Sequence, residues 1–214
     1  MNKCVILGAG GHARVLIDVM LEGERYDIAC VLDSDSSIWG KEIYGIPITG
    51  GDELLAGMMA KGISHFVVAV GSIKDNEPRA RLYRFAIDRG LAPLTITAVT
   101  ATVSKNAVLK PGCQILSRVV VNPGAIIGEN SIINTGAIIE HDCVIGKHVH
   151  VAPGAVLSGM VQVGDLAHIG TGASIKQGVR IGDGAVVGVG AAVISDVPKG
   201  QVVAGVPAKI IKTA

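Results

Sequence analysis

Residues 127–157 read IGENSIINTGAIIEHDCVIGKHVHVAPGAVL, and every sixth residue of this stretch is Ile, Leu or Val. The same phase continues in both directions without a slip. Its sixteen positions are Val103, Leu109, Ile115, Val121, Ile127, Ile133, Ile139, Ile145, Val151, Leu157, Val163, Ile169, Ile175, Ile181, Val187 and Val193. Four places after each one comes a small or β-branched residue, such as Ala107 or Val119. A fixed short period of this kind is the signature of a repeat architecture.

A six-residue period predicts a parallel β-helix over residues 96–214. Each repeat supplies one short strand and one corner, and three repeats close a triangular coil of about eighteen residues. Successive coils stack at about 4.8 Å, the spacing between paired strands. Pairs that tolerate turning, such as Pro123-Gly124 and Asp183-Gly184, fall at the corners. Because the repeat is unbroken, we expect no long loop to leave the helix.

Residues 1–95 have a different pattern, in which strands and helices alternate. We expect strands at Lys3–Leu7, Ile28–Leu32 and Phe66–Val70. We expect helices over His12–Leu21, from Gly50-Gly51-Asp52 to about Lys61, and over Glu77–Arg89. The expected buried helix residues are Val15, Leu16, Val19, Met20, Leu82, Phe85 and Ala86, and Asp52 is the expected N-cap. This alternation predicts a small Rossmann-like parallel sheet, that is, an α/β domain preceding the β-helix.

Composition limits the classes of function. The net charge is +1 without long runs of like charge, so we expect no nucleic-acid partner. No apolar stretch approaches the length of a membrane span or a signal peptide, so we expect a soluble, cytoplasmic protein. The four cysteines have no CxxC spacing and lie among aliphatic residues. We interpret them as small buried hydrophobic residues in a reducing compartment.

A glycine-rich turn follows the first strand. Gly8-Ala9-Gly10-Gly11-His12-Ala13 matches the pattern GxGxxG/A, and Asp33 lies where a ribose-binding acid would be expected. Glycines let a phosphate approach the backbone, and a helix N-terminus supplies oriented N–H groups. About 95 residues provide only half of a dinucleotide domain, so a mononucleotide or nucleotide-sugar fits better than NAD. A tight turn without a ligand is the alternative.

Four of the six histidines lie in the repeat. His141 and Asp142 occupy a corner, where neighbouring side chains can both project outward. An imidazole beside a carboxylate is a general-base arrangement. His150 and His168 hold the same place in coils eighteen residues apart, so we expect them to stack. Cys143 holds an inward place, which predicts a core residue rather than a nucleophile.

Other readings of these histidines remain open. Three histidines on a β-helix can bind Zn²⁺, as in β-helical carbonic anhydrases, and this would make the chain a zinc-dependent hydratase. No third ligand lies clearly beside His150 and His168, and His141 could join them only across a subunit boundary. A nucleotide-binding structural or regulatory protein with an inert β-helix is a further alternative.

The whole chain resembles a known family. The evidence is the order of GAGGHA, a short α/β domain, the unbroken hexapeptide helix, IIEHDCVIGKHVHVAPGA and a terminal GVPAK. It resembles the sialic-acid O-acetyltransferase and nucleotide-4-amino-sugar N-acetyltransferase group, which includes enzymes acting on GDP-perosamine and on the UDP-4-amino-trideoxy sugar of bacillosamine synthesis. The resemblance implies acetyl-CoA-dependent N-acetylation of a nucleotide-linked 4-amino-dideoxy sugar, or else sialic-acid-type O-acetylation.

The resemblance also implies a homotrimer of left-handed β-helices with active sites between subunits, and no required metal. His141 resembles the general base, and Asp142 its acidic neighbour. The residues implied to contact acetyl-CoA or the reaction centre are Asn134, His150, Thr171, Val189 and, in the GVPAK segment, Lys209. Those implied to hold the nucleotide-sugar are Gly10, Gly11, His12, Asp33, Ser34 and Gly71. Gly10 stands where some relatives have Ser, so the preference for GDP or UDP stays open.

Overall fold

A computed structural model of the chain describes residues 3–23, 25–72 and 75–213. The chain divides into two compact units. The first unit is Met1–Gly71 with Pro78–Thr95, and the second is Ser72–Glu77 with Ile96–Ala214. The short segment Ser72–Glu77 therefore belongs to the second unit, although it lies in the first half of the sequence.

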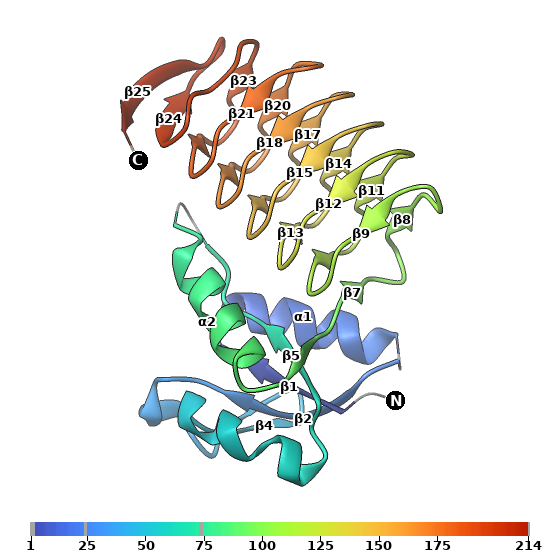
Figure 1. Cartoon of the computed structure of the whole chain (residues 1–214), viewed down its shortest axis with the longest axis vertical. Helices are drawn as coiled ribbons and strands as arrows, with labels where there is room; N and C mark the ends of the chain where they lie inside the picture. The colour runs from blue at the N-terminus through green and yellow to red at the C-terminus, as the bar shows by residue number, and fades with distance from the viewer. Residues whose placement is uncertain (1–2, 24, 73–74, 214) are drawn as a thin grey trace. The chain divides into compact units, whose positions relative to one another are not determined.

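The first unit contains a six-stranded sheet in the order β3-β4-β2-β1-β5-β6 (Figure 1). Its strands are β1 Lys3–Leu7, β2 Asp27–Leu32, β3 Glu42–Ile43, β4 Ile46–Gly50, β5 His65–Val68 and β6 Ala92–Pro93. Paired neighbours are parallel except β3 and β4, which form an antiparallel hairpin. The predicted parallel sheet is confirmed, and β1, β2 and β5 are the three strands that the apolar runs predicted. The other three are short or contain Pro and Gly, so their sequences carry no strand pattern.

Helices α1 Gly11–Glu22 and α2 Glu77–Ile87 lie close to the predicted ranges. In α1, Leu16, Val19 and Met20 are buried as predicted. Val15 is 41% exposed, so its prediction is wrong: the buried face is centred on Leu16, Ile17 and Met20. No helix in the described part of the chain combines the length and apolar character needed to cross a bilayer.

The buried face of α2 also differs from the prediction. Ala86 is buried, but Leu82 and Phe85 are half-buried, and Tyr83 and Arg79 take the central positions. The Arg79 guanidinium donates hydrogen bonds to the carbonyl oxygens of Val68, at 2.6 Å, and Val70, at 3.1 Å. The helix is therefore rotated to bring this cation onto the end of β5, which leaves Leu82 and Phe85 at the edge of the core.

The helix predicted from Gly50 to Lys61 is wrong. The segment forms two short 3-10 helices, η2 Asp52–Gly57 and η3 Met59–Lys61, and η1 Ser36–Ile38 is a third such turn. Gly51, not Asp52, is the N-cap of η2, and it has no side-chain capping bond. Gly57 weakens the middle of the segment, and Gly62, with φ of 74°, ends it. The Asp52 carboxylate is thereby left out of any cap.

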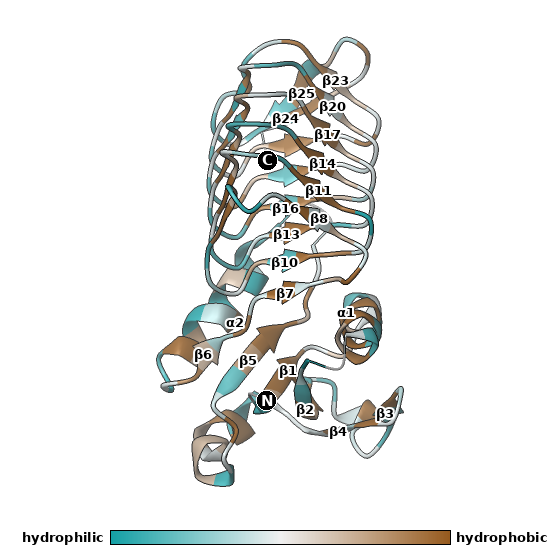
Figure 2. Cartoon of the chain, turned by 90° about the vertical axis from the view of Figure 1, so that its right-hand side faces the viewer, coloured by the Kyte–Doolittle hydropathy of each residue, from teal (hydrophilic) through white to brown (hydrophobic). Residues whose placement is uncertain are grey.

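The second unit is a left-handed parallel β-helix whose short strands, most of them two residues long, form three faces (Figures 1 and 2). The first face contains β7 Ile96–Thr97, β10 Gln114–Ile115, β13 Ile132–Ile133, β16 His150–Val151, β19 His168–Ile169, β22 Val186–Val187, β24 Gln201–Ala204 and β25 Lys209–Thr213. The second face contains β8 Thr102–Val103, β11 Val120–Val121, β14 Ile138–Ile139, β17 Val156–Leu157, β20 Ser174–Ile175 and β23 Ala192–Val193. The third face contains β9 Val108–Leu109, β12 Ile126–Ile127, β15 Val144–Ile145, β18 Gln162–Val163 and β21 Arg180–Ile181.

The coils from β7 to β23 are eighteen residues long, as the six-residue period predicts, and the last coil is sixteen residues long, since Val186 pairs with Val202. Ile115 pairs with Ile133, and Ile133 pairs with Val151. The fourteen repeat positions from Ile115 to Val193 are buried, and Val103 and Leu109 are half-buried against the first coil of the core. Burial of these side chains and of the small residues between them provides most of the stabilisation of the unit.

The four cysteines are free and buried, which confirms the interpretation of their role in packing. Cys143 lies in the β-helix core, where its thiol donates to the carbonyl of Ser158 at 3.2 Å. Burial raises the pKa of Cys143. Burial, with smaller effects of Asp27 and Cys30, raises the pKa of Cys4 to about 12. Neither thiol is therefore suited to act as a thiolate nucleophile.

Close stacking explains the glycines that follow many of the repeat positions. A Cβ atom on Gly146 would lie 2.8 Å from the backbone nitrogen of Asp165 in the next coil, and one on Gly128 would overlap the carbonyl of Gly146. No side chain fits between coils at these places. These positions are therefore restricted to glycine because there is no space for a Cβ atom, and not because the backbone angles require glycine.

Ser72 and Asn76 cover part of the first face. The Asn76 side-chain amide donates to the carbonyls of Leu166 and Ala167, at 3.0 and 2.9 Å, and the carbonyl of Ser72 accepts from His150 Nδ1 at 2.9 Å. The outward side chains of His150 and His168 are consequently buried, with 6% and 7% exposure. Their rings stack edge to face with centroids 5.1 Å apart, which confirms the predicted stacking.

We predict that His168 makes the β-helix less stable in acid. Loss of water lowers the pKa of His168 below its usual 6.5, so between these two values the unfolded chain binds the proton and the folded chain does not. Stability should be complete above pH 6.5 and should fall as the pH drops below it. In His168→Val, the melting temperature should fall less between pH 7.5 and 5.5; valine suits this face, since Val186 pairs with His168 from the next coil. A control is His141→Val, an exposed position. Parallel pH profiles for wild type and His168→Val would contradict this assignment.

Candidate active site

His141 and Asp142 form a surface pair at the corner between β14 and β15. Asp142 has φ of 58°, a left-handed conformation that Asp tolerates better than most residues. Its Oδ2 lies 2.9 Å from His141 Nδ1, and the two side chains are 63% and 51% exposed. Because a carboxylate only accepts, this bond selects the tautomer with Nδ1 protonated and leaves the lone pair of Nε2 available.

Two glycines hold this pair from neighbouring coils. A Cβ atom on Gly159, eighteen residues after His141, would lie 2.5 Å from His141 Nε2 and 2.6 Å from Cε1. A Cβ atom on Gly124, eighteen residues before Asp142, would overlap Asp142 Oδ1. The imidazole and carboxylate therefore rest on backbone where any side chain would displace them. Sequence reasoning missed both glycines, although the eighteen-residue spacing would have found them.

A second polar cluster surrounds His150 on the first face. His150 Nδ1 faces the Ser72 carbonyl at 2.9 Å and therefore donates, and the Ser72 hydroxyl lies 3.3 Å away. His150 Nε2 then accepts from the Asn134 amide at 3.1 Å. The Asn134 carbonyl oxygen in turn accepts from the backbone N–H of Thr135 at 2.7 Å. The predicted residues Asn134 and His150 are thus brought together, and Ser72 is a partner that the sequence did not indicate.

The remaining residues expected along the acetyl-CoA channel lie at the edge between the first and second faces. Thr171 and Val189 are the exposed corner residues of consecutive coils there, and Val189 is 78% exposed. Lys209 begins β25 and is also exposed. The corner of His141 lies between the second and third faces. Within one chain, the structure therefore does not bring His141 together with this group.

In the first unit, Gly10, Gly11 and His12 form the turn into α1, which has no capping side chain at its N-terminus. Gly8 follows β1 with φ of 102°, and a Cβ there would lie 2.8 Å from Val70 Cγ2. Uncapped N–H groups in the first turn of a helix are suited to bind a phosphate. Gly71 lies against His12, since a Cβ on Gly71 would be 3.3 Å from that of His12.

Asp33 holds the glycine-rich turn to the end of β2. Its Oδ2 accepts from the backbone N–H of Ala9 at 2.7 Å, and its Oδ1 accepts from that of Asp35 at 2.8 Å. Its own carbonyl accepts from the Trp39 indole at 2.9 Å. This carboxylate, expected beside a ribose, thus has a structural partner on each oxygen.

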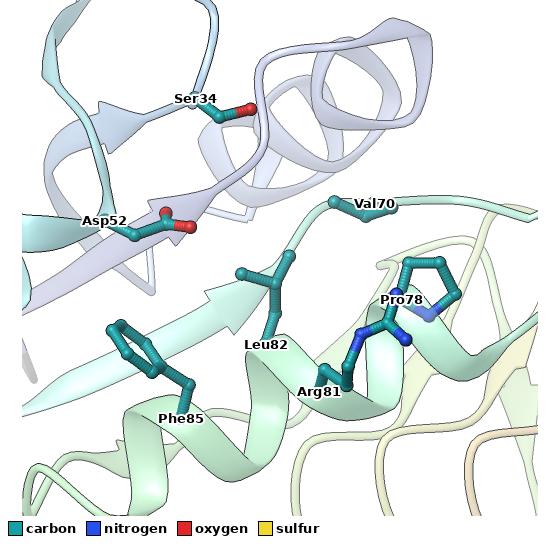
Figure 3. A pocket seen from close by; sticks show the side chains of 7 residues that line it. All are labelled: Ser34, Asp52, Val70, Pro78, Arg81, Leu82 and Phe85. Carbon is teal, nitrogen blue, oxygen red and sulfur yellow. The ribbon is translucent and has the colours of Figure 1, made fainter.

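A cavity of about 360 Å³ opens near the ends of β2, β4 and β5 (Figure 3). Its lining residues are Ser34, Asp52, Val70, Pro78, Arg81, Leu82 and Phe85. Only Ser34 among them was expected from the sequence. The others were missed because they gather from three segments, and because Asp52, Leu82 and Phe85 were assigned to a cap and to the core.

The described residues contain no group of three or more His, Cys, Asp and Glu side chains arranged to share a metal ion.

Comparisons with known proteins match both parts of the chain to family models. Residues 3–85 match the family model of the PglD N-terminal domain, and residues 106–140 and 124–159 match the model of the bacterial transferase hexapeptide, which has six repeats. The chain has no match among curated proteins.

Solved structures resemble the chain over its whole length. PerB from Caulobacter crescentus, in complex with CoA and GDP-perosamine, is 36% identical, with a TM-score of 0.92 over 99% of this chain and 98% of that one. The acetyltransferase domain of PglB from Neisseria gonorrhoeae FA1090, in complex with acetyl coenzyme A, is 31% identical, with a TM-score of 0.89 over 98% of this chain and 99% of that one. WeeI from Acinetobacter baumannii AYE is 26% identical, with a TM-score of 0.84 over 97% and 99%.

Identity above 30% over nearly the full length of both chains, together with matches to both domain models, shows the family. The chain belongs to the hexapeptide-repeat acetyltransferases that carry a PglD N-terminal domain.

Proposed function

We propose that the chain transfers an acetyl group from acetyl-CoA to the 4-amino group of a nucleotide-linked 4-amino-dideoxy sugar, either GDP-perosamine or a UDP-4-amino-trideoxyhexose. The observation that carries this proposal is the exposed His141–Asp142 pair on a β-helix of this family, with its Nε2 lone pair available. The complex of PerB with CoA and GDP-perosamine supports the class of both substrates.

The pair suits direct transfer to an amine. As the amino nitrogen attacks the thioester carbonyl, His141 Nε2 removes a proton from it, and Asp142 stabilises the imidazolium that forms. The new N–C bond forms, the C–S bond breaks, and the imidazolium returns the proton to the departing CoA thiolate. This route needs no acyl-enzyme intermediate, and no metal ion takes part in it. Cys143, although adjacent in sequence, is buried and its raised pKa opposes a nucleophilic role.

The two substrates are assigned to different parts of the chain. We assign Asn134, His150, Thr171, Val189 and Lys209 to the acetyl-CoA site, with His150 orienting the Asn134 amide through its 3.1 Å contact. The nucleotide-sugar is assigned to the first unit. There Gly10, Gly11 and His12 would hold the phosphates, Gly71 would border them, and Asp33 and Ser34 would lie near the nucleoside.

The assembly we propose is a homotrimer. His141 and the acetyl-CoA residues lie on different edges of the prism, so one chain alone does not unite them. Val108, Ile126 and Val144 also form an apolar column on the third face, with exposures of 45%, 36% and 43%. An exposed apolar column beside a catalytic pair is typical of a subunit contact. The reaction is assigned to the cytoplasm, a reducing compartment that fits the four free cysteines.

Replacement of His141 tests the proposed base. In His141→Asn, kcat for acetyl transfer to the nucleotide amino sugar should fall about a hundredfold or more, because general-base catalysis contributes about 10²–10⁴. Asp142→Asn should cost less, about tenfold, because the imidazole remains. Thiol release from acetyl-CoA measures both, with a panel of UDP- and GDP-linked 4-amino sugars as acceptors. Turnover by His141→Asn equal to that of the wild type would eliminate His141 as the base.

Gly159 positions the imidazole, so Gly159→Ala should lower kcat about tenfold while both KM values change less than twofold. The added methyl group would occupy the place of the His141 ring. In a His141→Asn background the same change should have little further effect, because there is no imidazole left to displace. Gly57→Ala is the control, since a Cβ there meets no atom within 4 Å. Additive losses in the double variant would show that Gly159 acts through stability alone.

The apolar column predicts the oligomeric state. Light scattering on the purified protein should give three times the chain mass of 21.9 kDa. Val144→Glu should shift the protein to smaller species and reduce activity, because it buries a charge in the contact. Val15→Glu, at a similarly exposed apolar residue of α1, should leave the trimer intact. A monomeric, fully active wild-type protein would refute the assembly.

A further inference from the structure

The cavity near the ends of β2, β4 and β5 lies where nucleotides bind in open α/β sheets. Ligands of such sheets bind beyond the carboxyl ends of the strands, next to the point where strand order reverses. Here β2 and β4 lie on one side of β1, and β5 lies on the other. Ser34 follows β2, Asp52 follows β4 and Val70 follows β5. If the glycine-rich turn holds the phosphates, as the proposed function requires, this cavity is available to the base.

The cavity has an apolar wall, the carboxylate of Asp52 and the guanidinium of Arg81. Val70, Leu82 and the Phe85 ring form an apolar surface against which a flat base can pack, and Arg89 lies over the Phe85 ring at 3.3 Å from its centroid. In Figure 3 the Asp52 carboxylate and the Ser34 hydroxyl come from the segments facing the helix that carries Leu82 and Phe85. A cavity of about 360 Å³ is within the usual range for small-molecule sites, about 300–1,000 Å³.

The Asp52 carboxylate has no structural role, such as a helix cap or a hydrogen bond, among the residues that the structure describes. It is half-buried, it caps no helix, and its carboxylate makes no hydrogen bond to the residues that the structure describes. Loss of water raises the pKa of Asp52, and the charges of Asp33 and Glu53 raise it further, while Arg89 lowers it. A partly desolvated carboxylate that receives no hydrogen bond is costly unless a ligand supplies donors.

The pattern of donors on each base decides which one fits. An ionised carboxylate accepts hydrogen bonds and donates none. Guanine presents two adjacent donors, N1–H and the N2 amino group, which match the two carboxylate oxygens in a bidentate pair. Uracil presents N3–H between two carbonyl oxygens, and adenine and cytosine each place a ring-nitrogen acceptor beside their amino group. These acceptors would face the carboxylate and repel it.

We infer that Asp52 reads the guanine base of the substrate in this cavity and makes the enzyme selective for GDP-linked over UDP-linked amino sugars. Asp52 is thus a specificity-determining residue, and its role rests on the proposed function. The rival role for a carboxylate here is to hold the ribose hydroxyls, which all nucleotides share, and the experiment separates the two.

Calorimetric titration of the full-length protein with free nucleoside diphosphates tests the inference without acetyl-CoA or amino sugar. GDP should bind about tenfold or more tightly than UDP. Inosine diphosphate, which lacks the N2 amino group, should bind about tenfold or more weakly than GDP, the usual loss for one hydrogen bond to a charged group. This comparison needs no variant.

Asp52→Asn should weaken GDP about tenfold or more and leave UDP unchanged. The same variant should gain affinity for xanthosine diphosphate, whose 2-oxo group accepts from the new amide. Glu53→Gln is the matched control: this carboxylate, the next in sequence, accepts from the Gly51 N–H and does not line the cavity. Its affinity for GDP should stay within twofold of wild type.

Three results would overturn the inference: UDP binding as tightly as GDP, inosine diphosphate binding as tightly as GDP, or equal losses of GDP and UDP in Asp52→Asn. The last would assign the carboxylate to the ribose. In each case a nucleotide still binds, so the proposed function stands. Failure of every nucleoside diphosphate to bind would instead remove the nucleotide-linked substrate, and this inference with it.

Discussion

The stacking of eighteen-residue coils is the constraint on which the rest of the second unit depends. Since each strand from β7 to β23 pairs in register with the strand one coil away, residues of these coils have fixed neighbours eighteen places along the chain. Core side chains form continuous columns, and glycines appear where the coils leave no space for a Cβ. The same rule places Gly124 under Asp142 and Gly159 over His141. Packing and chemistry are therefore set by one geometric relation.

A repetitive core also explains how such a thin unit can hold the exposed His141–Asp142 pair in place. The His141–Asp142 bond lies on a corner whose backbone is held by the coils on either side, including the bond from Met160 N–H to the His141 carbonyl at 2.9 Å. Neighbouring coils thus restrict the imidazole without burying it. In the first unit a side chain, not a neighbouring coil, fixes an exposed turn. There Asp33 fixes the glycine-rich turn by accepting hydrogen bonds from the backbone N–H groups of Ala9 and Asp35.

Much of the β-helix was predictable because its pattern is strict. One phase of Ile, Leu and Val determined the strands, the corners, the core position of Cys143 and the stacking of His150 on His168. The first unit was less predictable, since residues there have competing uses. Val15, Leu82 and Phe85 are apolar at helical spacing yet remain partly exposed, because the α1 face is centred elsewhere and Arg79 determines the rotation of α2. The cavity around Asp52 needs three segments brought together in space, which no local pattern records.

Segment Ser72–Glu77 has a practical consequence for dividing the molecule. The hexapeptide pattern begins after residue 96. The first face of the prism nevertheless depends on the Asn76 side chain and the Ser72 carbonyl, which lie before this pattern in the sequence. A fragment starting at residue 96 would present two stacked imidazoles and the backbone of Leu166 and Ala167 to water. The start of the hexapeptide pattern and the start of the folded unit are thus different places in the sequence. A fragment cut at residue 96 would lack the residues that cover its first face.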